Sequence, residues 1–71
     1  MGKRYEYHKR TLYVKGYETV NHRSYAPFFV DAKGYERIFL LNDELIARST
    51  EAEAQADLDE FARKRELAEV K

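Results

Sequence analysis

Short stretches of β-type alternation, separated by turn residues, occupy the chain from Arg4 to Arg48. The most apolar of them lie within YAPFFVDAKGYERIFLLNDELIAR, which begins at Tyr25. Its first turn signal runs from Asp31 to Gly34, because Asp favours the first position of a type I turn and Gly tolerates positive φ. Asn42-Asp43 is a second tight turn. The pattern predicts a three-stranded antiparallel meander with strands at 25–30, 35–41 and 44–48.

More sheet is expected before this meander. Side chains from Arg4 to Val14 alternate between two faces, and Tyr, Thr and Val favour a pleated surface, so this segment predicts a strand. Only Leu12 and Val14 give one of its faces an apolar character that suits a core. The polar segment from Asn21 to Ser24 predicts a loop.

Gly16 and Pro27 limit how these strands pair. Gly16 leaves two alternatives open: a tight turn followed by a short return strand over 17–20, or a bulge in one long strand from Arg4 to Val20. Pro27 has no N–H and cannot donate to a ladder, so we expect it at a sheet edge or at the start of its strand.

The last third of the chain has the features of a capped helix. Thr50 and Glu53 match a capping box, in which the hydroxyl accepts from the third backbone N–H of the helix. Acidic residues near the start and basic residues near the end favour the helix dipole. One face of this helix carries Ala54, Leu58, Phe61, Ala62 and the stem of Arg65. We predict a helix over about 50–66, followed by a loose tail.

Together these elements predict an α+β fold. An antiparallel sheet of four to five short strands, at about 4–48, is followed by one C-terminal α-helix packed on one face. A chain of 71 residues forms at most one domain, so residues 1–71 are expected to be a single small domain.

Composition removes several classes of chemistry. The sequence has no cysteine, which excludes disulfides, thiol catalysis and cysteine-based zinc sites, and which fits a reducing cytoplasm. Two histidines, His8 and His22, without a third strong ligand nearby in sequence, do not make a metal cage. No segment is long and apolar enough to span a bilayer. We therefore expect a cytoplasmic, non-enzymatic protein with no metal, no small-molecule cofactor and no membrane contact.

Charge is unevenly distributed although the formal net charge is zero. Residues 1–23 carry six Lys or Arg against two acids, whereas residues 43–71 carry five against nine. Cations contact phosphate and aromatic rings stack on bases, so a sheet face with both predicts a nucleic-acid-binding surface. Its candidate residues are Arg4, Tyr5, Tyr7, Lys9, Arg10, Tyr13, Lys15 and Arg23. Tyr and Lys are also common on the solvated face of an ordinary sheet.

A protein-interaction module is the alternative function. Phe28 and Phe29 point to opposite faces of their strand, and one helix covers only one face. The second face then carries large side chains that need a cover. The candidate interface residues are Phe29, Tyr35, Phe39 and Leu41. The cover is the N-terminal strand, a second copy in a homodimer or a protein partner, unless the sheet curls enough to bury both faces. Such a module would act as a small regulatory or inhibitory protein of the phage or mobile-element type.

The order of elements from Tyr25 to Arg65 resembles that of the three-strand-plus-helix domains that bind DNA at the N-termini of tyrosine recombinases. The segments FVDAKGYERIF and STEAEAQADLDEF follow that order. The resemblance covers about half the chain, is one of topology, and implies DNA binding. This chain departs from the pattern in having no tryptophan, an acidic helix and extra N-terminal strands.

Overall fold

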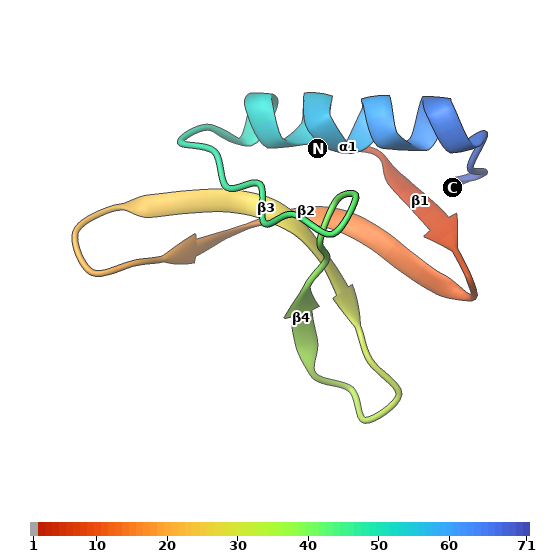
Figure 1. Ribbon diagram of the computed structural model, residues 1–71. Helices are drawn as coiled ribbons and strands as arrows, with labels where there is room; N and C mark the ends of the chain where they lie inside the picture. Colours follow the sequence, from red (N-terminus) through yellow and green to blue (C-terminus); the bar gives the residue numbers. More distant parts are fainter. Residues whose placement is uncertain (1) are drawn as a thin grey trace.

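The structure, a computed structural model, describes residues 2–71. This part of the chain contains five strands and one helix. They are β1 (Arg4–Tyr7), β2 (Arg10–Glu18), β3 (Arg23–Val30), β4 (Glu36–Ile38), α1 (Glu51–Arg65) and β5 (Glu69–Val70). The strands form one antiparallel sheet in the order β4-β3-β2-β1-β5, and α1 lies across one face of it (Figure 1). The predicted α+β arrangement of sheet and C-terminal helix is confirmed.

A two-residue turn separates β1 from β2. His8 and Lys9 both have positive φ, 49° and 65°, and Tyr7 pairs with Arg10 across the turn. Two positive φ values in succession are typical of the type I′ hairpin turn. The prediction of one strand from Arg4 to Val14 is therefore wrong. Neither turn residue is the Gly, Asn or Asp that normally reveals such a turn, so alternation appeared to continue through it.

Gly16 is a regular position within β2, and both alternatives considered for it are wrong. The pairing of β2 with β3 runs without a bulge from Tyr13–Phe28 to Glu18–Arg23, and Gly16 pairs with Tyr25. A Cβ at Gly16 would lie 2.8 Å from Cε2 of Tyr25, so glycine leaves room for that ring. The chain reverses over residues 19–22 instead.

Pro27 lies in the middle of β3, not at its start. Tyr25 donates its N–H to the Arg48 carbonyl (2.8 Å), and alternation places the Pro27 nitrogen on this same side of β3. The Pro27 carbonyl accepts from the Phe39 N–H (2.9 Å), and β4 ends at Ile38. The missing donor thus faces the side of β3 where β4 has ended, which is an edge in the sense that proline requires.

The two predicted turns after β3 are confirmed. The Gly34 N–H donates to the Asp31 carbonyl (3.0 Å), and Gly34 has a φ of 90°. Asn42 and Asp43 have φ values of 52° and 65° and connect residues that exchange two backbone hydrogen bonds. The predicted third strand over 44–48 is wrong, because the chain leaves the sheet after β4 to reach the helix layer. Only Arg48 returns, in an isolated bridge to Tyr25.

α1 begins and ends close to the predicted positions. Thr50 Oγ1 accepts from the Glu53 N–H (3.2 Å), and the Glu53 carboxylate accepts in turn from that hydroxyl (2.9 Å). The helix ends at Arg65. The next residue, Glu66, has a left-handed φ of 54°, and the Leu67 N–H donates to the Ala62 carbonyl (2.9 Å). This bonding is typical of a Schellman cap.

The predicted loose tail is wrong, because the left-handed residue Glu66 turns the chain back toward the sheet. β5 pairs with the outer edge of β1, where Tyr5 lies opposite Glu69. The Glu6 N–H also donates to the Ala68 carbonyl (2.9 Å). The N- and C-terminal segments are therefore neighbours in the sheet.

The core lies between α1 and one face of the sheet. The predicted apolar face of α1 is buried, with Ala54 and Leu58 fully covered. The buried core residues are Tyr5, Leu12, Leu41, Leu58, Phe61 and Ala62. Phe29 and Phe39 are partly buried and pack against this core. The apolar residues of β3 and the segment after β4 thus divide between the two faces of the sheet.

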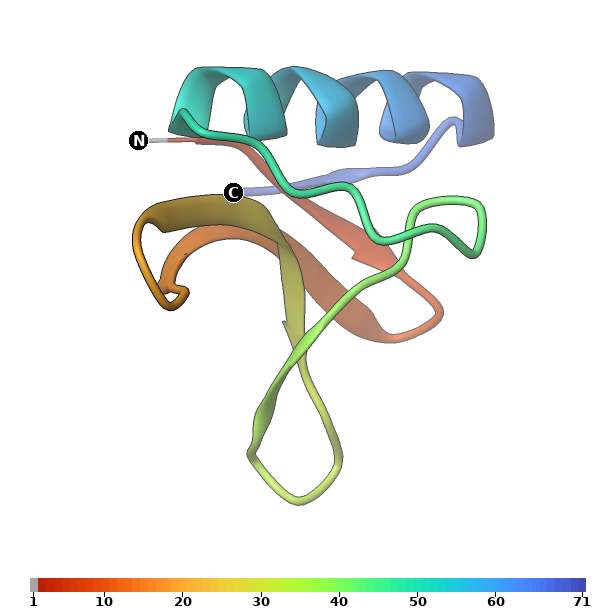
Figure 2. The ribbon, with the colours of Figure 1, turned by 60° about the vertical axis from the view of Figure 1, so that its left-hand side comes forward.

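On the face of the sheet that points away from α1, aromatic side chains cover one another. Phe28 is buried there, with the Tyr13 ring stacked 6.4 Å from its own and the Tyr17 ring 5.8 Å away in an edge arrangement. β2 and β3 bend strongly along their length (Figure 2), and the three rings lie in contact on this face of the two strands. The face without a helix is therefore the one that carries Phe28, whereas Phe29, Phe39 and Leu41 lie on the face that α1 covers.

Candidate functional site

The predicted nucleic-acid-binding residues do not share one surface. Tyr5 is only 8% exposed, and its hydroxyl donates to Asp59 Oδ1 (2.6 Å). Burial, reinforced by Asp59, raises the pKa of Tyr5 to about 12. Tyr7 is half-buried against Phe39 and Phe61, at ring separations of 5.4 and 5.6 Å. Tyr5 is therefore a core residue with no face open to a base, and Tyr7 closes the end of the core.

Two of the predicted cations have acidic partners. Lys15 pairs with Glu36, and Arg23 pairs with Glu18 (2.8 Å). Hydrogen bonds from Lys15, and then from Tyr13, hold the pKa of Glu36 below its usual range. Because each of these cations already has an acidic partner within the sheet, Lys15 and Arg23 are weaker candidates for phosphate contacts than the sequence alone indicated.

The remaining cations surround one hollow of about 360 Å³ at the β1–β2 corner of the sheet, which we name the basic hollow. Its lining residues are Arg4, Lys9, Arg10, Thr11, Tyr13 and Val30. Within residues 2–71, none of its three cations has an acidic side chain within ion-pair distance. Glu6 shares a strand face with Arg4 but does not line the hollow.

The hairpin register explains why these side chains meet. Tyr5 and Leu12 pair across β1 and β2 and both point into the core, so their neighbours Arg4, Thr11 and Tyr13 point to the other face. β2 pairs with β3 only as far as Tyr13–Phe28, and the two strands separate beyond it (Figure 1). The hollow lies at this separation. Sequence reasoning missed Thr11 and Val30, because only the register identifies them as neighbours of the cations.

Arg10 shares the face of β2 that carries Leu12, so its side chain lies on the α1 side of the sheet and borders the basic hollow only at its edge. Its guanidinium carbon lies 4.6 Å from the centroid of the Phe29 ring, within the range of a cation–π interaction. Such a contact stabilises the position of the side chain and leaves its N–H donors for an anion. Lys9 occupies the turn itself and is exposed.

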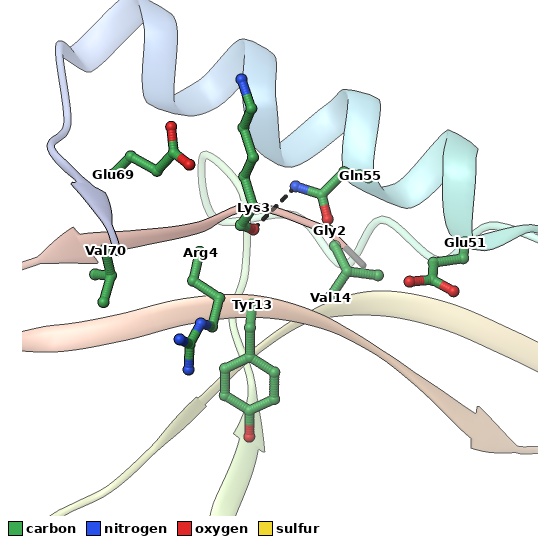
Figure 3. A pocket seen from close by; sticks show the side chains of 9 residues that line it. All are labelled: Gly2, Lys3, Arg4, Tyr13, Val14, Glu51, Gln55, Glu69 and Val70. Atoms are coloured by element: carbon green, nitrogen blue, oxygen red, sulfur yellow. Dashed lines mark hydrogen bonds between the residues drawn. The ribbon is translucent and has the colours of Figure 1, made fainter.

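Tyr13 forms a rigid wall of the basic hollow. Its ring stacks on Phe28, and its hydroxyl donates to Glu36 Oε2 (2.5 Å). Burial, followed by this hydrogen bond, raises the pKa of Tyr13 to about 12. Figure 3 shows Tyr13 and Arg4 pointing away from α1, whereas the Lys3 side chain extends toward it. Tyr13 and Arg4 therefore belong to the face of the sheet opposite the helix.

A second hollow, of about 580 Å³, lies on the other side of Arg4 and Tyr13, next to α1 (Figure 3). It contains the carboxylates of Glu51 and Glu69, so its charge is mixed. Gln55 closes part of it by donating to the Lys3 carbonyl (3.1 Å). The lining of the basic hollow, in contrast, includes no acidic residue among residues 2–71, although Glu6 lies beside it opposite Thr11.

The predicted protein-interface residues are also divided. Leu41 is 6% exposed, and Phe29 and Phe39 pack against the core under α1, with Phe39 5.5 Å from Phe61. The expectation that they lie on a face without a cover is therefore wrong. Tyr35, in contrast, is 63% exposed. The exposed large apolar side chains of the structure are Val20, Val30, Tyr35, Leu40 and Leu45.

His8 and His22 lie in the turns at opposite ends of β2, so they do not converge on one site. Within residues 2–71, no three His, Cys, Asp or Glu side chains come together in a way that would hold a metal ion. No helix of the described chain combines the length and apolarity needed to cross a membrane.

Comparison with protein-family models, with curated proteins and with solved structures finds no match to this chain. The topological resemblance to the DNA-binding domains of tyrosine recombinases also weakens on the structure itself. That resemblance needs a third strand over 44–48, where the structure has only the Arg48–Tyr25 bridge and the Leu41–Glu44 turn. The site must be interpreted from its own geometry.

Proposed function

We propose that this protein is a non-enzymatic, cytoplasmic nucleic-acid-binding module whose basic hollow receives the phosphate backbone of its ligand. The observation that carries the proposal is that Arg4, Lys9 and Arg10, none of which forms an ion pair within residues 2–71, line one hollow together with Tyr13. Cationic side chains supply most of the affinity in contacts with nucleic-acid phosphates. Hydrogen bonds between Arg or Lys and phosphate are charge-assisted and strong.

The segregation of charge in the fold supports this proposal. Two acids of α1 form ion pairs on the helix side of the sheet: Asp57 pairs with Arg48 (2.7 Å), and Glu60 pairs with Arg63 (2.7 Å). The basic hollow opens on the other side of the sheet. A zero net charge is therefore compatible with a locally positive surface, because the field near a surface depends on the nearest unneutralised charges.

Charge reversal in the basic hollow tests the proposal. We expect Lys9→Glu and Arg10→Glu each to weaken binding of a labelled oligonucleotide by roughly tenfold at low salt, since each removes a phosphate contact and adds repulsion. The slope of log affinity against log salt should fall by about 1 in each variant. Fluorescence anisotropy across a salt series measures both quantities.

Lys33→Glu is the matched control. It makes the same change in net charge at an exposed position of the β3–β4 turn, outside the basic hollow. Its affinity should stay close to that of the native protein. Equal losses in all three variants would show that only total charge matters, and an affinity independent of salt would overturn the proposal.

A further inference from the structure

Tyr13 is fixed before any ligand arrives. Phe28 lies against one side of its ring at an interplanar angle of 27°, and Glu36 accepts from its hydroxyl at 2.5 Å. Tyr13 also lines the basic hollow, and its side chain points to the same face of the sheet as Arg4 and Thr11. A side chain held in this way loses little conformational entropy when a planar group stacks on it.

The cations stand at both ends of the space beside this ring. Arg4 lies next to Tyr13, whereas Lys9 and Arg10 lie at the turn end of the hairpin. The three residue steps of β2 from Arg10 to Tyr13 span roughly 10 Å, at about 3.3 Å per residue. A space of this length suits a contact with only a few nucleotides of a strand.

We infer that the ligand of the basic hollow is single-stranded nucleic acid, with one base stacked on Tyr13 and adjacent phosphates on Arg4 and on Lys9 or Arg10. This inference rests on the proposed function and narrows it to one class of ligand. A positively charged groove combined with an aromatic stacking surface is the usual way to bind single strands. In a duplex the bases stack on each other, so none is free to reach a ring in the wall of a hollow.

The experiment combines a change in the protein with a change in the ligand. Labelled single strands of roughly six to eight nucleotides, as DNA and as RNA, are compared with the same sequence as a duplex. A third set contains a single abasic position, moved along the strand. Affinities are measured by anisotropy for the native protein, Tyr13→Leu and Tyr13→Phe.

Three results are expected together. The native protein binds the single strand more tightly than the duplex. Tyr13→Leu loses roughly fivefold to tenfold in affinity for the intact strand, whereas Tyr13→Phe keeps the ring and most of the affinity. The best-placed abasic site costs the native protein a similar factor but costs Tyr13→Leu little, because the two changes remove the same stack.

Tyr35→Leu controls for the loss of a tyrosine, since Tyr35 is exposed and does not line the hollow. If Tyr13→Leu proves unfolded by circular dichroism, the abasic series on the native protein tests the stack without any substitution. Equal affinity for duplex and single strand, together with no abasic penalty, overturns this inference while leaving nucleic-acid binding in place. No binding to any of these ligands overturns both.

Discussion

At the scale of single residues, Tyr5 and Tyr13 show how the same side chain takes two different roles. Both hydroxyls donate to a carboxylate, and burial raises the pKa of both to about 12. Tyr5 points into the core and joins β1 to α1 through Asp59, whereas Tyr13 points away from α1 and walls the basic hollow. Sequence alternation had placed these two side chains on one face. The two-residue turn at His8 and Lys9 places them on opposite faces instead. This turn contains no Gly or Asn from which it could have been predicted.

Tyr5→Phe tests the structural role of the buried hydroxyl. We expect a loss of about 1–2 kcal/mol in the free energy of unfolding at pH 7, because Asp59 loses a charge-assisted hydrogen bond. The folded pKa of about 12 lies above the ordinary value of 10, so this stabilisation is complete below pH 10 and disappears as pH rises from 10 through 12. Urea unfolding at pH 7 and at pH 11 measures both effects.

Tyr5→Phe should therefore lose less stability than the native protein when the pH is raised. Tyr35→Phe is the control, because its hydroxyl is exposed and has no hydrogen-bond partner within residues 2–71. A loss in Tyr35→Phe as large as that in Tyr5→Phe would contradict the role assigned to the Tyr5–Asp59 bond.

At the scale of elements, the sequence was most informative where local chemistry decides the structure. The helix could be predicted from Thr50 to its end, because a cap and an apolar stripe act within a few residues. The Asp31–Gly34 turn was equally clear. The pairing of β5 with β1 and the loss of a strand after β4 could not be predicted, because both depend on distant partners. The basic hollow combines β1, β2 and the end of β3, so its cations and Tyr13 could be predicted from the sequence but Thr11 and Val30 could not.

The β1–β2 turn gives a test that separates stability from binding. Lys9 has a φ of 65°, a conformation that costs a residue other than glycine about 1 kcal/mol. Lys9→Gly should therefore raise the free energy of unfolding by roughly 0.5–1 kcal/mol. It should also weaken oligonucleotide binding, because it removes one cation of the basic hollow. Urea unfolding and anisotropy on the same sample measure the two changes.

Asp43→Gly makes the matching backbone change in the other turn of this kind, where Asp43 also has a φ of 65°. It lies outside the basic hollow, so it should stabilise the protein by a similar amount and leave binding unchanged. A Lys9→Gly protein that is more stable and binds as tightly as the native one would argue that Lys9 makes no phosphate contact.

At the scale of the whole molecule, the fold separates the acidic residues near α1 from the basic residues of the β1–β2 hairpin. Asp57 pairs with Arg48 and Glu60 pairs with Arg63 beside α1, whereas Arg4 points to the far side of the sheet and Lys9 lies exposed in the β1–β2 turn. Phe29 and Phe39, which had suggested a protein interface, pack against the core under α1, whereas Tyr35 is exposed near the open edge strand β4. This arrangement leaves the basic hollow as the surface that best combines charge with an aromatic wall.

The most direct test of this account is a titration of the ¹⁵N-labelled protein with a short single-stranded oligonucleotide at low salt, followed by amide chemical shifts. We predict that the largest changes cluster at Arg4, at residues 9–13 and at Val30, and that they diminish as salt is added. Small changes are expected along the exposed face of α1. Shifts centred on β4 and Tyr35, or changes that depend on protein concentration and not on the oligonucleotide, would contradict the account and favour protein interaction or self-association.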